Sequence, residues 1–117
     1  MTDEIKKYLH DIKTSIYAIN EYLGNERNFF AFQNNRMLKK AIEREFEIIG
    51  EAMNRILKID RNISISASRK IVDLRNYLSH GYDTVDYSTL WGIISKHLPQ
   101  LEVEITELLN DNNEINS

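Results

Sequence analysis

The sequence predicts an all-α protein, an antiparallel bundle of four to five helices. Apolar residues recur at intervals of three and four along nearly the whole chain, which is the period of an amphipathic helix. One proline and four glycines in 117 residues leave few positions at which a helix must stop. The length fits one compact domain, which we expect to span residues 1–110, with a disordered tail at 111–117.

The first helix is predicted to run from about Thr2 to Leu23. Its apolar stripe consists of Ile5, Leu9, Ile12, Ile16, Ile19 and Leu23. Thr2 suits the N-cap position, and Gly24 suits the residue at which the helix stops. Residues 24–34 are predicted to form a connection. Its phenylalanines should fold back onto the core: Phe29, Phe30 and Phe32.

The second helix is predicted from about Asn35 to Lys58, with Ile42, Ile49 and Ile56 on its buried face. Gly50 lies in the middle of it, where glycine costs about 1 kcal/mol relative to alanine. A close approach by another helix would explain a glycine there.

The third helix is predicted from about Ser66 to Ser79, before the sequence His80-Gly81. After a short loop, Asp86 is expected to cap a fourth helix. Pro99 has no N–H group, so it should kink or restart that helix.

Composition excludes several classes of protein. The chain has no cysteine, which removes disulfides, thiolate metal sites and thiol nucleophiles. No apolar run approaches the roughly 20 residues of a membrane span. The N-terminus lacks the layout of a signal peptide, so we expect a cytoplasmic protein without a membrane partner. No Asp, Glu and His residues have metal-ligand spacing, and we expect neither metal nor cofactor.

The net charge of −3 conceals an uneven distribution. Residues 27–80 hold eleven basic and six acidic side chains, whereas residues 81–117 hold one basic and seven acidic ones. A positive face beside a negative one is one interpretation. A solvated helix surface followed by an acid-rich end is the other.

The polar residues with the strongest functional signal lie at the end of the third predicted helix. Arg75 and Ser79 are one turn apart, as are Asn76 and His80, so each pair can touch. Arg75 and His80 would diverge on an ideal helix. A turn at the glycine after His80 can bring His80 and Tyr82 back toward Arg75.

This set suits RNA cleavage without a metal ion. Histidine titrates near neutral pH and can take or give the proton of a reacting hydroxyl group. Arginine stays charged and binds phosphate through two parallel hydrogen bonds. Asn76 and Ser79 would support the catalytic pair, Arg75 and His80. On spacing alone, however, Arg and His near a helix end more often cap carbonyl groups and offset the helix dipole.

The run Arg75-Asn76 through His80-Gly81-Tyr82 resembles the R-N-x-x-x-H-x-Y signature of HepT-like proteins, which are minimal HEPN-domain proteins. Residues 41–52 resemble the second-helix signature of that family, and Asp86, Trp91 and residues 98–101 resemble its fourth-helix positions. The likeness extends over residues 3–109. A tryptophan that often precedes the third helix is absent, and Ser66-Ala67-Ser68 stands there.

The resemblance implies a HEPN-like homodimer that acts as the ribonuclease toxin of a toxin–antitoxin pair, with Arg75 and His80 as its catalytic residues. It implies RNA, either tRNA or mRNA, as the substrate. It also implies a minimal nucleotidyltransferase antitoxin as the cognate partner, which transfers AMP to Tyr82 and silences the nuclease. A larger hetero-oligomer with the antitoxin is a further expectation.

Two other classes of function stay open at this point. The same bundle could be a non-catalytic module that binds a nucleotidyltransferase or a nucleotide, with Arg75 only holding phosphate. It could also be a structural dimerisation bundle. Glu47 and Glu51 are one turn apart and could reach toward the motif, although exposed carboxylates or salt-bridge partners are the more common roles. His10 and His97 have no partner in the pattern and are interpreted as surface or structural residues.

Overall fold

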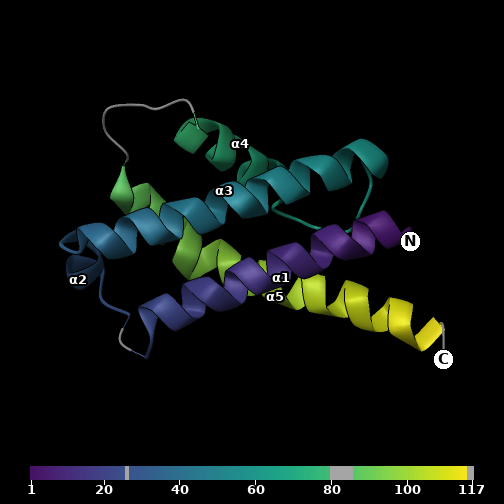
Figure 1. The fold of residues 1–117 in the computed structure, drawn as a ribbon, viewed down its shortest axis with the longest axis horizontal. Coiled ribbons are helices and arrows are strands. Elements are labelled where there is room, and N and C mark those ends of the chain that lie inside the picture. The colour runs from purple at the N-terminus through teal and green to yellow at the C-terminus, as the bar shows by residue number, and fades with distance from the viewer. Residues whose placement is uncertain (26, 80–85, 116–117) are drawn as a thin grey trace.

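The computed structural model describes residues 1–25, 27–79 and 86–115 and contains five helices within them (Figure 1). They are α1 (Asp3–Leu23), α2 (Phe29–Gln33), α3 (Arg36–Ile59), α4 (Ser68–Ser79) and α5 (Tyr87–Ile115). Successive long helices run in opposite directions, and the short α2 lies at one end of α3. The prediction of an all-α antiparallel bundle is therefore confirmed. Over the described residues, no helix combines the length and apolar character needed to cross a membrane.

The helix boundaries follow from local side-chain chemistry. The Thr2 hydroxyl accepts a hydrogen bond from the Ile5 N–H at 3.1 Å and caps α1, as the sequence predicts. Gly24 ends α1 with a φ of 65°, a value that glycine adopts without strain. The Asn35 side chain accepts from the Leu38 N–H at 3.0 Å and caps α3. These local signals place the ends of α1 and the start of α3 within one residue of the prediction.

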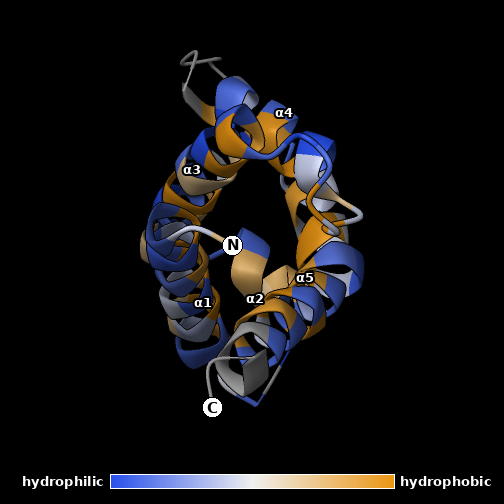
Figure 2. Ribbon diagram, turned by 90° about the vertical axis from the view of Figure 1, so that its right-hand side faces the viewer, coloured by the Kyte–Doolittle hydropathy of each residue, from blue (hydrophilic) through white to orange (hydrophobic). Residues whose placement is uncertain are grey.

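The core lies between α1, α3, α4 and α5, and α4 packs against α3 and buries Ile71, Val72 and Leu74 in it. Figure 2 shows the apolar faces of the long helices turned toward the interior of the bundle. The buried side chains include Leu9, Ile12, Ile16, Ile42, Phe46, Ile49, Met53, Ile71, Leu90, Ile94, Leu98 and Ile105. Every residue of the stripes that the sequence predicts for the first and second helices is buried in this core.

The first connection differs from the prediction, because it contains α2. Phe32 is buried and its ring centroid lies 5.1 Å from that of Trp91, while Phe29 packs against Trp91 at 6.0 Å. Phe30 is 74% exposed, so the expectation that it folds onto the core is wrong. In a helix, residues 29 and 32 share one face, and Phe30 between them points toward solvent.

The last helix begins where the sequence predicts. The Asp86 carboxylate accepts hydrogen bonds from the Ser88 and Thr89 N–H groups at 3.1 and 3.4 Å and caps α5. The helix continues through Pro99 without restarting, because Leu98 and Leu101 anchor it in the core on both sides. Helix α5 extends to Ile115, and no glycine or proline follows Pro99 in the sequence.

Candidate functional site

The position of Arg75 is determined by a close contact between α3 and α4. A Cβ atom placed on Gly50 would lie 2.1 Å from Arg75 Cβ and 2.7 Å from Arg75 Cγ, which is closer than atoms can pack. Only glycine therefore permits this approach. The close helix contact that the sequence predicts at Gly50 is confirmed, and its partner is the helix that carries the motif.

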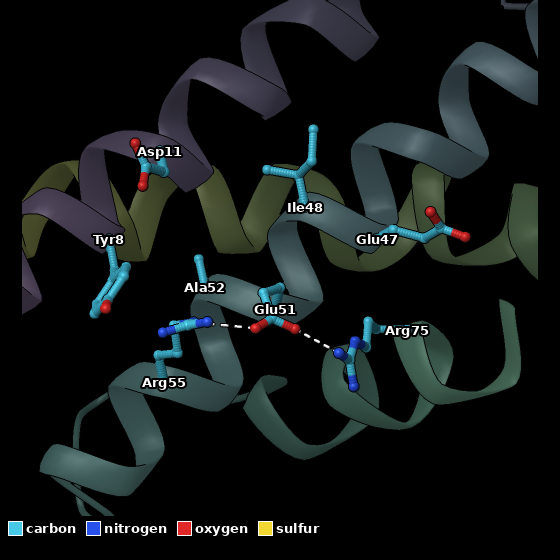
Figure 3. Close-up of a pocket in the computed structure, with 8 residues that line it drawn as sticks. All are labelled: Tyr8, Asp11, Glu47, Ile48, Glu51, Ala52, Arg55 and Arg75. Carbon is cyan, nitrogen blue, oxygen red and sulfur yellow. Dashed lines mark hydrogen bonds and ion pairs between the residues drawn. The ribbon is translucent and has the colours of Figure 1, made fainter. Parts of the chain in front are cut away.

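The Arg75 side chain makes two polar contacts next to this point (Figure 3). Its guanidinium group pairs with Glu51 on α3 and donates a hydrogen bond to Asn76 Oδ1 at 3.0 Å. The other oxygen of Glu51 accepts from Arg55 Nε at 3.0 Å. Glu51 therefore lies between two guanidinium groups and limits the orientations that Arg75 can adopt.

An open pocket of about 380 Å³ surrounds this pair, and we call it the Arg75 pocket. Helix α1 contributes Tyr8 and Asp11 to it, and α4 contributes Arg75. Its α3 wall is formed by Glu47, Ile48, Glu51, Ala52 and Arg55. Arg75 is 31% exposed at the wall of this pocket, so a ligand from solvent can reach its guanidinium group.

Arg55 is held in its charged state by its neighbours in the pocket. The Tyr8 hydroxyl and the Glu51 carboxylate raise the pKa of Arg55 above its ordinary value. Tyr8 itself donates a hydrogen bond to Glu4 Oε1 at 3.3 Å, which ties its ring to α1. Tyr8 on the α1 wall of the pocket therefore interacts with Arg55 on its α3 wall.

Two hydrogen bonds connect the start of α5 to α4 and α3. The Asp86 N–H donates to the Tyr77 hydroxyl at 3.3 Å and ties the start of α5 to α4. Tyr87 donates to Glu43 Oε2 at 3.2 Å and ties it to α3. Burial of Tyr87, together with the Glu43 charge, raises the pKa of this tyrosine. The start of α5 is therefore fixed against both helices that form the Gly50–Arg75 contact.

The predicted site residues can now be placed. Arg75 and Asn76 are adjacent and hydrogen-bonded, and Ser79 is the last residue of α4. His80 and Tyr82 lie outside the described residues, so their positions stay predictions. The salt-bridge role considered for Glu51 is confirmed, and its partner is the motif arginine itself.

Three polar residues of the Arg75 pocket were not predicted from the sequence: Tyr8, Asp11 and Arg55. Arg55 could have been found, because it lies one helical turn after Glu51 and such spacing favours an ion pair. The two α1 residues gave no local signal, since they reach the pocket through the packing of α1 against α3.

A family model described as "Ribonuclease HepT-like" matches residues 4–108. The chain belongs to the HepT-like ribonuclease family. The match includes both helices that form the Gly50–Arg75 contact and the whole motif from Arg75 to Tyr82.

Individual relatives agree with the family match. The archaeal protein "Putative RNase MJ1216" of Methanocaldococcus jannaschii is 32% identical over 86% of this chain and 89% of its own length. "Putative RNase MJ1380" of the same organism is 33% identical over 87% of this chain and 94% of its own length. A bacterial relative, "Putative RNase TTE0752" of Caldanaerobacter subterraneus, is 34% identical over 70% of this chain and 74% of its own length. No solved structure shows significant similarity to the chain.

Proposed function

We propose that this HepT-like protein is the toxin of a toxin–antitoxin pair and cleaves RNA without a metal ion. The observation that carries the proposal is the placement of Arg75. Its guanidinium group is oriented by Glu51 and faces an open pocket, five residues before a histidine on the same motif. A scaffold that only packs helices has no use for an oriented, accessible arginine five residues before a histidine in the sequence.

The chemistry assigned to the pair is in-line attack by the ribose 2′-hydroxyl on the adjacent phosphate. The imidazole of His80 takes the proton of the 2′-hydroxyl as the 2′-oxygen bonds to phosphorus, or supplies the proton to the departing 5′-oxygen, and water serves in the other proton transfer. The phosphorus–O5′ bond breaks, leaving a 2′,3′-cyclic phosphate and a 5′-hydroxyl. Arg75 offsets the charge that accumulates on the phosphorane oxygens.

The test is incubation of the purified protein with total tRNA and mRNA in the presence of EDTA, beside His80→Ala. We expect cleavage products with cyclic phosphate ends from the wild type and none from His80→Ala. Equal cleavage by the two proteins would remove His80 from the mechanism. RNA binding without cleavage by either would favour the alternative, a non-catalytic module that binds a nucleotide or a nucleotidyltransferase.

Silencing is assigned to Tyr82, as the acceptor of AMP from a cognate nucleotidyltransferase. Tyr82 lies two residues after His80, and each adenylate would add one negative charge where RNA phosphate has to bind. Incubation with partner and ATP, followed by peptide mass mapping, should locate the added AMP on Tyr82. Modification of another residue, or full silencing of Tyr82→Phe by the partner, would contradict this assignment.

The active form is proposed to be a homodimer with the motifs of two chains facing one cleft. One Arg75 and one His80 are few groups for holding a polyanion, and a two-fold axis doubles the local positive charge. Light scattering at micromolar protein concentration should give twice the 13.8 kDa chain mass. A molar mass equal to that of one chain would contradict the proposal of a shared cleft.

A further inference from the structure

We propose that the Arg75 pocket is a nucleobase subsite beside the phosphate that Arg75 binds, and that it favours guanine. This inference rests on the proposed ribonuclease function, but it concerns which part of the RNA enters the pocket. The volume of about 380 Å³ lies within the range of roughly 300–1,000 Å³ that is typical of small-molecule sites.

The charges in the pocket determine which part of a nucleotide it can accept. Two guanidinium groups, of Arg55 and Arg75, face three carboxylates, of Asp11, Glu47 and Glu51. The arginines are already engaged by Glu51, so the remaining carboxylates make the interior repel an anion. A phosphate group is therefore excluded from the interior and can reach Arg75 only at the rim. The interior suits an uncharged group that offers hydrogen-bond donors.

The walls of the pocket suit a flat, partly apolar ligand. The half-buried Tyr8 ring and the partly exposed Ile48 side chain lie on its α1 and α3 walls. In Figure 3 Asp11 and Ile48 lie above the Glu51–Arg75 pair, and Tyr8 lies beyond Arg55. Stacking of a base on an aromatic ring contributes to single-strand binding whatever the base is, because every base has a π face. Tyr8 therefore accounts for affinity and not for selectivity.

The selectivity comes from Asp11 and Glu47, which lie on opposite walls of the pocket. Carboxylates only accept hydrogen bonds, so they favour bases with donor groups on the edge that pairs in duplexes. Guanine presents two adjacent donors, N1–H and N2–H, which match the two oxygens of one carboxylate. Uracil presents a single N–H between two carbonyl oxygens and should be the weakest ligand.

The test is the binding of uncleavable 2′-O-methyl RNA pentamers, UUGUU, UUAUU, UUCUU and UUUUU, to the full-length protein by fluorescence anisotropy. We expect UUGUU to bind about tenfold more tightly than UUUUU. The double variant with Asp11→Asn and Glu47→Gln should lose this preference while its affinity for UUUUU stays equal or rises, because two repelling charges are removed. General damage to the fold would lower the affinity for every pentamer.

A matched control removes two carboxylates elsewhere. Glu21 on α1 and Glu107 on α5 are exposed and lie outside the pocket. The double variant with Glu21→Gln and Glu107→Gln should keep the tenfold preference. Tyr8→Ala should weaken all four pentamers by a similar factor, and Tyr8→Phe should not.

Equal affinity of the wild type for the four pentamers, or no measurable binding at millimolar RNA, would overturn the subsite. Because these RNAs cannot be cleaved, the outcome is independent of catalysis. Cleavage of total RNA without a pentamer preference would support the nuclease function and contradict the guanine subsite. A guanine preference without cleavage would support the guanine subsite and contradict the nuclease function.

Discussion

Gly50 and Arg75 are in such close contact that a Cβ atom on Gly50 would lie 2.1 Å from Arg75 Cβ. The contact joins the middle of α3 to the last two turns of α4 and brings Arg75 beside Glu51, the next residue along α3. Gly50 thus allows α4 to approach α3 closely enough for Arg75 to pair with Glu51. Its cost in helix propensity, about 1 kcal/mol, is offset by the packing that it permits.

Gly50→Ala should push α4 away from α3 and misplace Arg75. We expect the free energy of unfolding in urea to fall by about 1–3 kcal/mol, because overpacking exceeds the gain in helix propensity. RNA cleavage should fall by at least tenfold.

Gly92→Ala is the matched control, since no atom lies within 4 Å of a Cβ placed on Gly92 in α5. It should leave the protein equally stable or stabilise it by up to about 1 kcal/mol. Equal stabilities of Gly50→Ala and the wild type would contradict the close contact.

Glu51→Gln should separate catalysis from binding. The pair with Arg75 is partly exposed, so we expect the free energy of unfolding to change by less than about 1 kcal/mol. The kcat should fall by about tenfold or more, because the guanidinium group is no longer held in one orientation. The KM for RNA should not rise, because the lost negative charge leaves the site more attractive to phosphate.

The control for that variant is Glu45→Gln on the same helix, since Glu45 pairs with the Tyr22 hydroxyl outside the pocket. Steady-state cleavage of one labelled RNA gives both constants. A rise in KM with unchanged kcat would show that Glu51 does not position Arg75.

The cap of α5 should make stability depend on pH in the acidic range. Hydrogen bonds from the Thr89 side chain and backbone, ahead of that from Ser88, lower the pKa of Asp86 below its ordinary value near 3.8. The stabilisation is therefore complete above that ordinary value and is lost as the pH falls through the lowered pKa. Asp86→Ala should unfold at a lower temperature than the wild type at pH 7, and this deficit should shrink toward pH 2.

Asp86→Asn keeps a capping oxygen without the charge, so its deficit should be smaller than that of Asp86→Ala at pH 7. Thermal unfolding followed by circular dichroism at both pH values measures the difference. A deficit of Asp86→Ala that stays constant between pH 7 and pH 2 would contradict the role of the ionised carboxylate.

Local signals in the sequence predicted most of the bundle. Thr2, Gly24 and Asp86 act on the backbone within a few residues, so their chemistry can be interpreted without knowledge of the fold. Gly50 could be assigned a close contact, because a glycine in the middle of a helix costs stability that such a contact can offset. Phe30 was misplaced because an apolar residue in a connection does not reveal which way a short helix such as α2 turns it.

The candidate site was predictable only in part, because it combines local and distant residues. The motif arginine was evident from the order of residues 75–82. That Glu51 pairs with it, and that Tyr8 and Asp11 complete the pocket, depends on how α1 and α4 pack on α3. Such packing brings together residues more than twenty positions apart and leaves no regular spacing in the sequence.

Arg75 is proposed to stabilise the charge that develops on the scissile phosphate. The RNA cleavage rate of Arg75→Ala measures this role directly. Removing a single donor of this kind lowers kcat by roughly 10²–10³-fold in enzymes. We expect a loss of that size or larger with unchanged helical circular dichroism, and only partial recovery in Arg75→Lys, which keeps the charge but not the two-pronged donor. The control Arg69→Ala, at an exposed position of the same helix, should cleave RNA like the wild type. Cleavage by Arg75→Ala at the wild-type rate would contradict the account.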